Sequence, residues 1–175
     1  MRALVVACVL GCGLPVAALT VKPLSFPELV SESGAVVHGR VTEVRSQWTA
    51  DRRGIESLIV VQAIGYLKGE WGAEVTVRVP GGQVGTFINL IPGAPRLVQG
   101  DHVILFLKAS GPAVPVITGT SQGVYRVVPD VSGALMVVPP LIETGAPVTA
   151  RGDLARRPLS LPAFAEAVRR VEAAR

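Results

Sequence analysis

The pentapeptide Gly119-Thr120-Ser121-Gln122-Gly123 matches G-x-S-x-G, the nucleophile turn of many serine hydrolases. In that motif a strand precedes the serine, a helix follows it, and the histidine base comes later in the chain. Here a strand-like run, Val124 to Val127, follows the motif, and both histidines of the sequence, His38 and His102, precede Ser121. The pattern favours a tight glycine turn, with no catalytic residue. A small hydrolase using Ser121 stays as a second alternative.

The two histidines are also candidate metal ligands. His38 lies in a valine-rich run and His102 begins a later apolar run, with Asp51 or Asp101 as a conceivable third ligand. Zinc sites usually show closely spaced ligands, and no such local spacing occurs around either histidine. We therefore expect isolated strand histidines, no metal site and no cofactor.

The segment from Pro80 to Pro95 is the favoured binding loop. Its start, Pro80 to Gly85, is rich in glycine but lacks the lysine and hydroxyl residue of a phosphate-binding loop. Long loops inside compact domains are often functional. The candidate binding residues in and beside this loop are Arg78, Gly81, Gly82, Gly85, Pro92, Gly93 and Arg96.

Length and composition indicate one folded domain. The chain has 175 residues, of which 49% are hydrophobic and only 17% charged, which excludes a largely disordered protein. The formal net charge is only +4, and the basic pairs are scattered. Nucleic-acid binding would need a basic stripe with stacking aromatic side chains, so we do not expect a nucleic-acid partner.

The first residues predict export. Met1-Arg2 is followed by the apolar run Ala3 to Leu14 and by the small residues Val16-Ala17-Ala18, which is the pattern of a signal peptide cleaved after Ala18. The run is too short to span a membrane, so we expect no transmembrane segment in the mature chain. Both cysteines, Cys8 and Cys12, lie in this leader, so the mature chain would have no disulfide. The apolar segment before Cys12 is shorter than in lipoprotein signals, and a lipid anchor at Cys12 is not expected.

Alternating valines and regular turns predict a mostly β fold. Expected strands cover residues 35–49, 55–67, 74–79, 102–107, 124–128 and 135–138, with a further short strand inside 86–91. Gly39, inside the first long strand, predicts a bend or bulge. Five or six strands with this spacing predict a small closed or partly open OB-like barrel.

Two helices are expected to flank the strands. Ser25 and Glu28 have the spacing of a capping box, which predicts a short helix that ends at Gly34. Ser160 caps a C-terminal helix with an apolar face that includes Phe164 and Val168. The expected limits are 1–18 for the signal peptide, 19–138 for the barrel, 139–158 for a Pro/Gly-rich tether and 159–175 for the amphipathic helix packing on the barrel.

Several short patterns together give a resemblance to a known group. They are Val37-His38-Gly39-Arg40-Val41, Tyr66-Leu67-Lys68-Gly69, Pro80-Gly81-Gly82, Pro92-Gly93-Ala94-Pro95, Gly100-Asp101 before Leu105-Phe106-Leu107, and Gln122-Gly123 before Tyr125-Arg126-Val127. On these patterns the mature chain resembles a family of uncharacterised exported bacterial proteins. The order of the strands more distantly resembles the OB-type barrel of tissue inhibitors of metalloproteinases and netrin-like modules. Those inhibitors use an N-terminal cysteine and disulfides that the mature chain lacks.

The combined expectation is a non-catalytic binding or interaction module, exported to the periplasm or secreted. Its partner would be another exported protein or a cell-envelope component. The first alternative, which rests on the barrel resemblance, is a protease inhibitor or a protease-associated protein.

Overall fold

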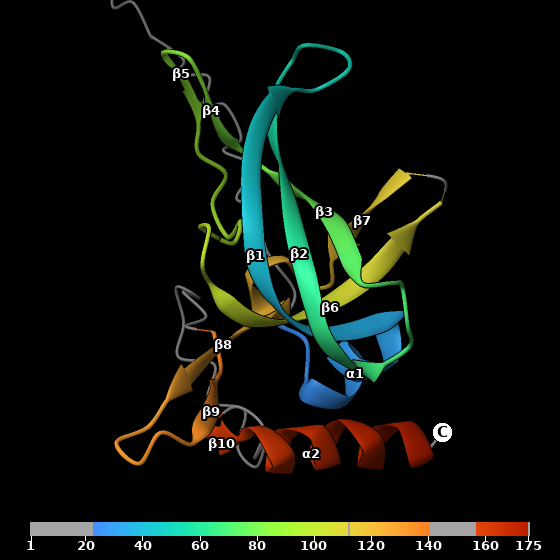
Figure 1. Cartoon of the computed structure of the whole chain (residues 1–175). Helices are drawn as coiled ribbons and strands as arrows, with labels where there is room; N and C mark the ends of the chain where they lie inside the picture. The colour runs from blue at the N-terminus through green and yellow to red at the C-terminus, as the bar shows by residue number, and fades with distance from the viewer. Residues whose placement is uncertain (1–22, 112, 141–156, 175) are drawn as a thin grey trace, which may run out of the picture.

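A computed structural model describes residues 23–111, 113–140 and 157–174 (Figure 1). The predicted signal peptide, with Cys8 and Cys12, and most of the predicted 139–158 tether lie outside the described residues. The elements in chain order are α1 (Phe26–Glu32), β1 (Ala35–Trp48), β2 (Ile55–Lys68), β3 (Glu74–Pro80), β4 (Gly82–Val84), β5 (Phe87–Asn89), β6 (His102–Ser110), β7 (Ala113–Ile117), a 3₁₀ turn η1 (Thr120–Gly123), β8 (Val124–Pro129), β9 (Leu135–Val138), β10 (Leu159–Ser160) and α2 (Leu161–Ala173).

The chain is mostly β, and five of its strands form a ring. One mixed sheet of eight strands has the order β1-β2-β3-β7-β6-β8-β9-β10, and a further pairing of β1 with β6 closes the first five into the ring. The β3–β7 pair is parallel, and the other pairs of this sheet are antiparallel. The ring leaves β8, β9 and β10 as an extension beside α2.

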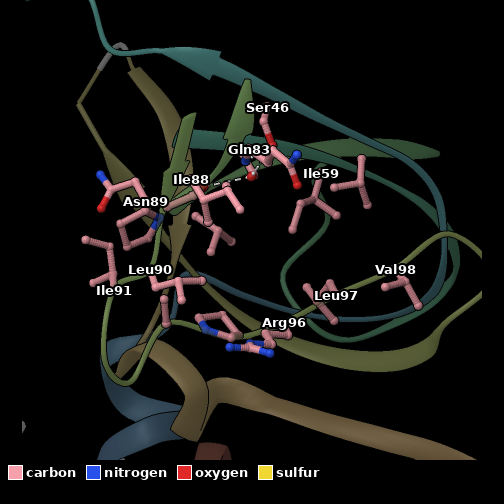
Figure 2. Close-up of a pocket in the computed structure, with 18 residues that line it drawn as sticks. Ser46, Ile59, Gln83, Ile88, Asn89, Leu90, Ile91, Arg96, Leu97 and Val98 are labelled. Carbon is pink, nitrogen blue, oxygen red and sulfur yellow. Dashed lines mark hydrogen bonds between the residues drawn. The ribbon is translucent and has the colours of Figure 1, made fainter. Parts of the chain in front are cut away.

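The β4–β5 hairpin forms a second, two-stranded sheet beside the C-terminal end of β1 and the N-terminal end of β2 (Figure 1). The short strand expected inside 86–91 is confirmed as β5, whereas its partner β4 lies in a part that we expected to be plain loop. Ile88 and Leu90 of this segment lie across a hollow from Ile59 (Figure 2).

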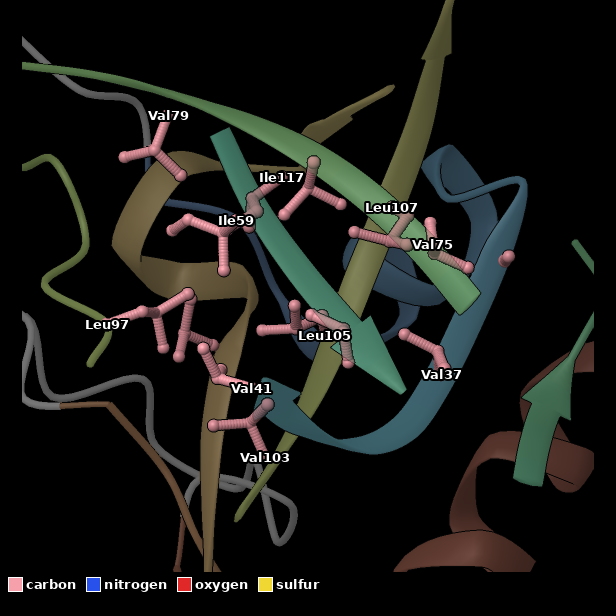
Figure 3. Close-up of a cluster of buried hydrophobic side chains, with 14 residues drawn as sticks. Val37, Val41, Ile59, Val75, Val79, Leu97, Val103, Leu105, Leu107 and Ile117 are labelled. Carbon is pink, nitrogen blue, oxygen red and sulfur yellow. The ribbon is translucent and has the colours of Figure 1, made fainter. Parts of the chain in front are cut away.

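Alternation along the strands gives the fold two separate cores. Val37, Val41, Ile59, Val75 and Leu105 belong to the cluster that fills the ring (Figure 3). Residues that alternate with these, such as Val36 of β1 and Ile104 of β6, point to the outside of the ring because successive side chains of a strand alternate between its faces. They form a second cluster between the outside of the ring and the two helices.

Aromatic rings bind the helices to this second cluster. Phe164 of α2 lies edge-on to Phe26 of α1, with 5.5 Å between ring centroids, and 5.0 Å from the ring of Tyr125. Both helices begin as predicted: Ser25 and Glu28 form the capping box, and the Ser160 side chain accepts a hydrogen bond from the Ala163 amide. The expected strands, the β8–β9 hairpin and the flanking helices are thus confirmed.

The strand β7 was not predicted. Its run, Ala113 to Ile117, contains Pro115, and proline is disfavoured inside sheets because it cannot donate a ladder hydrogen bond. The pairing with β6 shifts register between Lys108 and Ser110, opposite this part of β7. A bulge leaves a residue unpaired, which explains how the strand accommodates its proline.

Candidate functional site

Two serines that face each other across β1 and β2 hold the β4–β5 hairpin in place. Ser46 and Ser57 are register partners, and their hydroxyl oxygens lie 3.0 Å apart. The Ser57 hydroxyl donates to the Gly81 carbonyl at 2.8 Å, and the Ser46 hydroxyl accepts from the Gln83 amide at 3.2 Å. Nothing in the sequence distinguished these serines from ordinary strand residues, and only the strand register reveals their role.

The glycines that begin the predicted loop are explained by this tether. Gly82 has a φ of +144°, and a Cβ at this position would collide with the hydroxyls of Ser46 and Ser57. Gly81 has a φ of +91°, and a Cβ there would lie 2.8 Å from the Asn89 carbonyl oxygen. The Gly81-Gly82 pair therefore lets the hairpin backbone approach the chain's own strands closely.

The hairpin borders a half-open pocket of about 450 Å³ at the end of the ring, which we call the hairpin pocket (Figure 2). Its polar lining consists of Ser46, Ser57, Gln83, Asn89 and Arg96. The larger part of its lining is apolar and comes from Val44, Ile59, Val79, Pro80, Ile88, Leu90, Ile91, Ala94, Pro95, Leu97 and Val98. Few polar groups on a mostly apolar wall are typical of ligand sites.

Large apolar side chains around this pocket are open to solvent. The exposed fractions are 62% for Phe87, 61% for Ile88, 70% for Leu90 and 62% for Val98. Phe87 also contacts the half-exposed Trp48 edge-on, with 5.4 Å between ring centroids. A cluster of exposed apolar residues is typical of a binding surface, whereas isolated ones are ordinary.

The predicted binding residues are divided among different places. Gly81, Gly82 and Arg96 line the hairpin pocket. Gly85, with a φ of +59°, forms the turn between β4 and β5. Pro92 and Gly93 lie outside the pocket lining, and the Gly93 carbonyl accepts a hydrogen bond from the Ser121 amide at 3.3 Å.

Arg78, the remaining predicted residue, lies in a second hollow of about 360 Å³. Its guanidinium is 3.8 Å from the Glu56 carboxylate, and Val116 and Thr120 line the same hollow. Val79, Pro80 and Pro95 border both hollows. Arg78 is therefore a neighbour of the hairpin pocket, and its charge is partly compensated by Glu56.

Within the described ranges, Ser121 has neither the following helix nor the hydrogen-bonded histidine that the serine of a hydrolase nucleophile turn has. It lies in the 3₁₀ turn η1, which leads directly into strand β8. Among the described residues, no hydrogen bond joins its hydroxyl to a histidine, and the two histidines contact each other. Its backbone amide is bonded to the Gly93 carbonyl, so its place in the fold is that of a turn residue.

The histidines are close together, so the expectation of isolated strand histidines is wrong. The Nε2 atoms of His38 and His102 lie 2.6 Å apart, and the ring planes are 21° apart with 4.8 Å between centroids, so the rings meet end-on. Burial lowers the pKa of His38, and the positive charge of Arg40 lowers it further. Burial also lowers the pKa of His102, followed by the charges of His38 and Arg40. Sequence spacing could not show this contact, because the pairing of β1 with β6 creates it.

Over the described ranges, no group of three or more His, Cys, Asp or Glu side chains converges. In the same part of the chain, no helix is long and apolar enough to cross a membrane.

A scan against models of protein families finds no matching family, and a search of the curated proteins finds no relative. The resemblance to exported bacterial proteins therefore stays a prediction.

Proposed function

We propose that this protein is a non-catalytic exported binding module that takes an apolar group of its partner into the hairpin pocket. One observation carries the proposal: three strongly exposed apolar side chains, Ile88, Leu90 and Val98, line a pocket that is itself mostly apolar. Covering such side chains removes apolar surface from water, which stabilises a complex by roughly 25 cal/mol per Å². The partner would be another exported protein or a component of the cell envelope.

The proposed frame for this site is an OB-like barrel. The five strands of the ring, numbered in chain order among themselves, have the closed order 1-2-3-5-4, with strands 3 and 5 parallel. A closed five-stranded ring with this non-sequential order supports the OB-like interpretation, since that fold is a five-stranded Greek-key barrel. In this proposal residues 19–138 form the barrel domain, and the helix at 159–175 is its C-terminal cover.

An apolar fluorescent dye tests the pocket directly. Leu90→Ser and Ile88→Ser should each weaken dye binding at least threefold, because both side chains line the pocket and are exposed. Val131→Ser is the matched control, since Val131 is fully exposed in the β8–β9 turn, away from the pocket lining. Equal dye binding by all three variants and the unaltered chain would contradict the proposal.

A photo-crosslinking side chain at position 88, expressed in the native host, tests for a partner. We expect an adduct with an envelope component that the same side chain at position 131 does not give.

A protease inhibitor is the alternative, and the ring order that supports the barrel also favours it. Slowing of an exported metalloprotease by micromolar protein would support this alternative, whereas unchanged rates would dismiss it.

A further inference from the structure

The outer face of the ring carries the histidine pair. His38 lies on β1 and His102 on β6, and these neighbouring antiparallel strands pair His38 with Ile104 and Arg40 with His102. The two histidines are therefore diagonal neighbours on one face, which long side chains can bridge. The residues that alternate with them, such as Val37 and Val103, fill the ring. Both imidazoles thus project from two paired strands of the closed five-stranded ring. Such strands hold side chains more firmly than a loop would.

An irregularity in β2 leaves space beside His38. The β1–β2 register moves from His38↔Gly65 to Gly39↔Ala63, so Ile64 is an extra residue and is 57% exposed. Bulges of this kind are common next to functional sites, because they redirect side chains. Gly65 is the register partner of His38, and a Cβ added to it would meet no atom within 4 Å. The space next to His38 on the β2 side is therefore unfilled, although His38 itself is only 8% exposed.

From this geometry we propose that His38 and His102 chelate one divalent transition-metal ion through their Nε2 atoms. Metal–imidazole bonds are about 2.0–2.1 Å long, so two adjacent ligands at a right angle have nitrogens about 2.9 Å apart. The observed 2.6 Å needs only a few tenths of an ångström of opening, but the rings meet end-on, so each imidazole must also turn for its Nε2 lone pair to point at the shared ion. The proton of the Nε2–H···Nε2 contact would have to leave or move to Nδ1, because only an unprotonated nitrogen binds a metal.

Copper(II) is the ion that this donor set favours, with zinc(II) second. Imidazole suits both ions, and divalent copper binds a given nitrogen site more tightly than zinc. Within the described part of the chain, no third His, Cys, Asp or Glu joins the pair. The remaining coordination positions are therefore open to water or to a ligand from solution, as in an exchangeable site. The charge of Arg40 acts on both histidines and opposes a bound cation.

The test measures binding of Cu²⁺ alone, and of Zn²⁺ alone, to the whole purified chain. Cys8→Ser and Cys12→Ser are present in every sample, so that thiolates do not compete where the leader is retained. We expect one ion per chain, an electron paramagnetic resonance spectrum of Cu²⁺ with coordinated nitrogen, and a thermal midpoint that rises with metal concentration. His38→Gln and His102→Gln should each weaken binding by at least tenfold, since loss of a group outside the ligands already costs about 10–100-fold.

Arg40→Gln should change the affinity for Cu²⁺ in the opposite direction from the histidine variants. Removing this positive charge should tighten Cu²⁺ binding severalfold, because the charge opposes the ion. A merely structural role of the histidines predicts no such gain. The proposal is overturned if the His38→Gln/His102→Gln double variant binds Cu²⁺ as well as the unaltered pair. It is equally overturned if the unaltered pair binds neither ion. Because the hairpin pocket shares no lining residue with the pair, dye binding by these variants reports separately on the proposed function.

Discussion

The Nε2 atoms of His38 and His102 lie 2.6 Å apart, so only one of them can carry a proton between the two rings. A second proton between them would set two N–H groups against each other and create an imidazolium beside Arg40. Burial is the largest cause of the lowered pKa at both residues, and burial of a cation is unfavourable unless it is paired. In the metal-free protein this contact therefore favours the neutral form of both imidazoles.

This relationship predicts that mild acid destabilises the metal-free protein. In the unfolded chain both histidines have the ordinary pKa of 6.5, whereas in the folded chain both pKa values are lower. As the pH falls below about 6.5, the unfolded chain gains protons first, so the free energy of unfolding decreases. It levels off only below the folded pKa values. From about one pH unit above 6.5 the two states bind nearly the same number of protons at these sites, and little contribution is expected.

Urea unfolding in a chelator at pH 7.5, 6.5 and 5.5 measures this effect. The His38→Gln/His102→Gln variant is the comparison, because it lacks both titrating groups. Its stability should change less over this range than that of the unaltered protein. An equal loss in both proteins would show that other groups cause the acid sensitivity.

Gly82→Ala should detach the β4–β5 hairpin. The new Cβ would collide with Ser46 and Ser57, and the φ of +144° is strained for any other residue. Strained backbone of this kind costs about 1–3 kcal/mol. We expect faster hydrogen exchange at the Gln83 amide and loss of dye binding by the hairpin pocket.

Gly85→Ala is the matched control for that change. Gly85 also has a positive φ, but its missing Cβ would meet no atom within 4 Å. Only the left-handed conformation is penalised, by about 1–2 kcal/mol. Dye binding should persist at a temperature where the variant is folded. Loss of binding in both variants to the same degree would mean that the serine tether does not shape the pocket.

The local features of this fold were readable from sequence, whereas the close contacts between distant segments were not. The Ser25–Glu28 capping box and the β8–β9 turn depend on residues close in the chain, and both are confirmed. Gly39 was expected to mark a bend or bulge, and the β1–β2 register does shift between His38 and Gly39. A Cβ on Gly39 would lie 2.5 Å from the Gln62 carbonyl oxygen, which explains the glycine. The Ser46–Ser57 tether and the His38–His102 contact come from strand register, which alternation alone does not fix.

The candidate site shows the same limit. The glycines of the loop were identified, but the apolar partners on β1 were not, since Trp48 lies 39 residues before Phe87 and joins it only in space. Arg78 was grouped with the loop because it precedes it closely, yet its side chain lines the neighbouring hollow with Glu56.

Phe164→Ala should show that α2 is an integral part of the domain. The Phe164 side chain is 1% exposed and lies against Phe26, Phe106 and Tyr125. Truncating such a side chain costs about 3–5 kcal/mol, because transfer and cavity terms add. Chemical denaturation should give one transition, shifted to lower denaturant. Glu166→Ala, on the exposed side of the same helix with its partner Arg169, should cost only about 0.2–0.5 kcal/mol. A helix that merely tethers the chain would give similar small losses for both.

Neither Trp48 nor Phe87 lines the hairpin pocket, but Phe87 is next to Ile88, which does. The fluorescence of Trp48 should therefore report an apolar group that extends from the pocket onto Phe87. The Trp48 ring is 39% exposed and contacts Phe87, whereas the other tryptophan, Trp71, packs against the ring core. In a Trp71→Phe variant the emission therefore comes from Trp48 alone. A bound apolar group would exclude water from the indole, which should shift the emission to shorter wavelength. Phe87→Ala should reduce both this shift and the dye affinity while changing stability by less than about 1 kcal/mol, because exposed side chains contribute little to folding. An emission maximum that stays constant while dye saturates the protein would place the bound dye away from the Trp48–Phe87 pair.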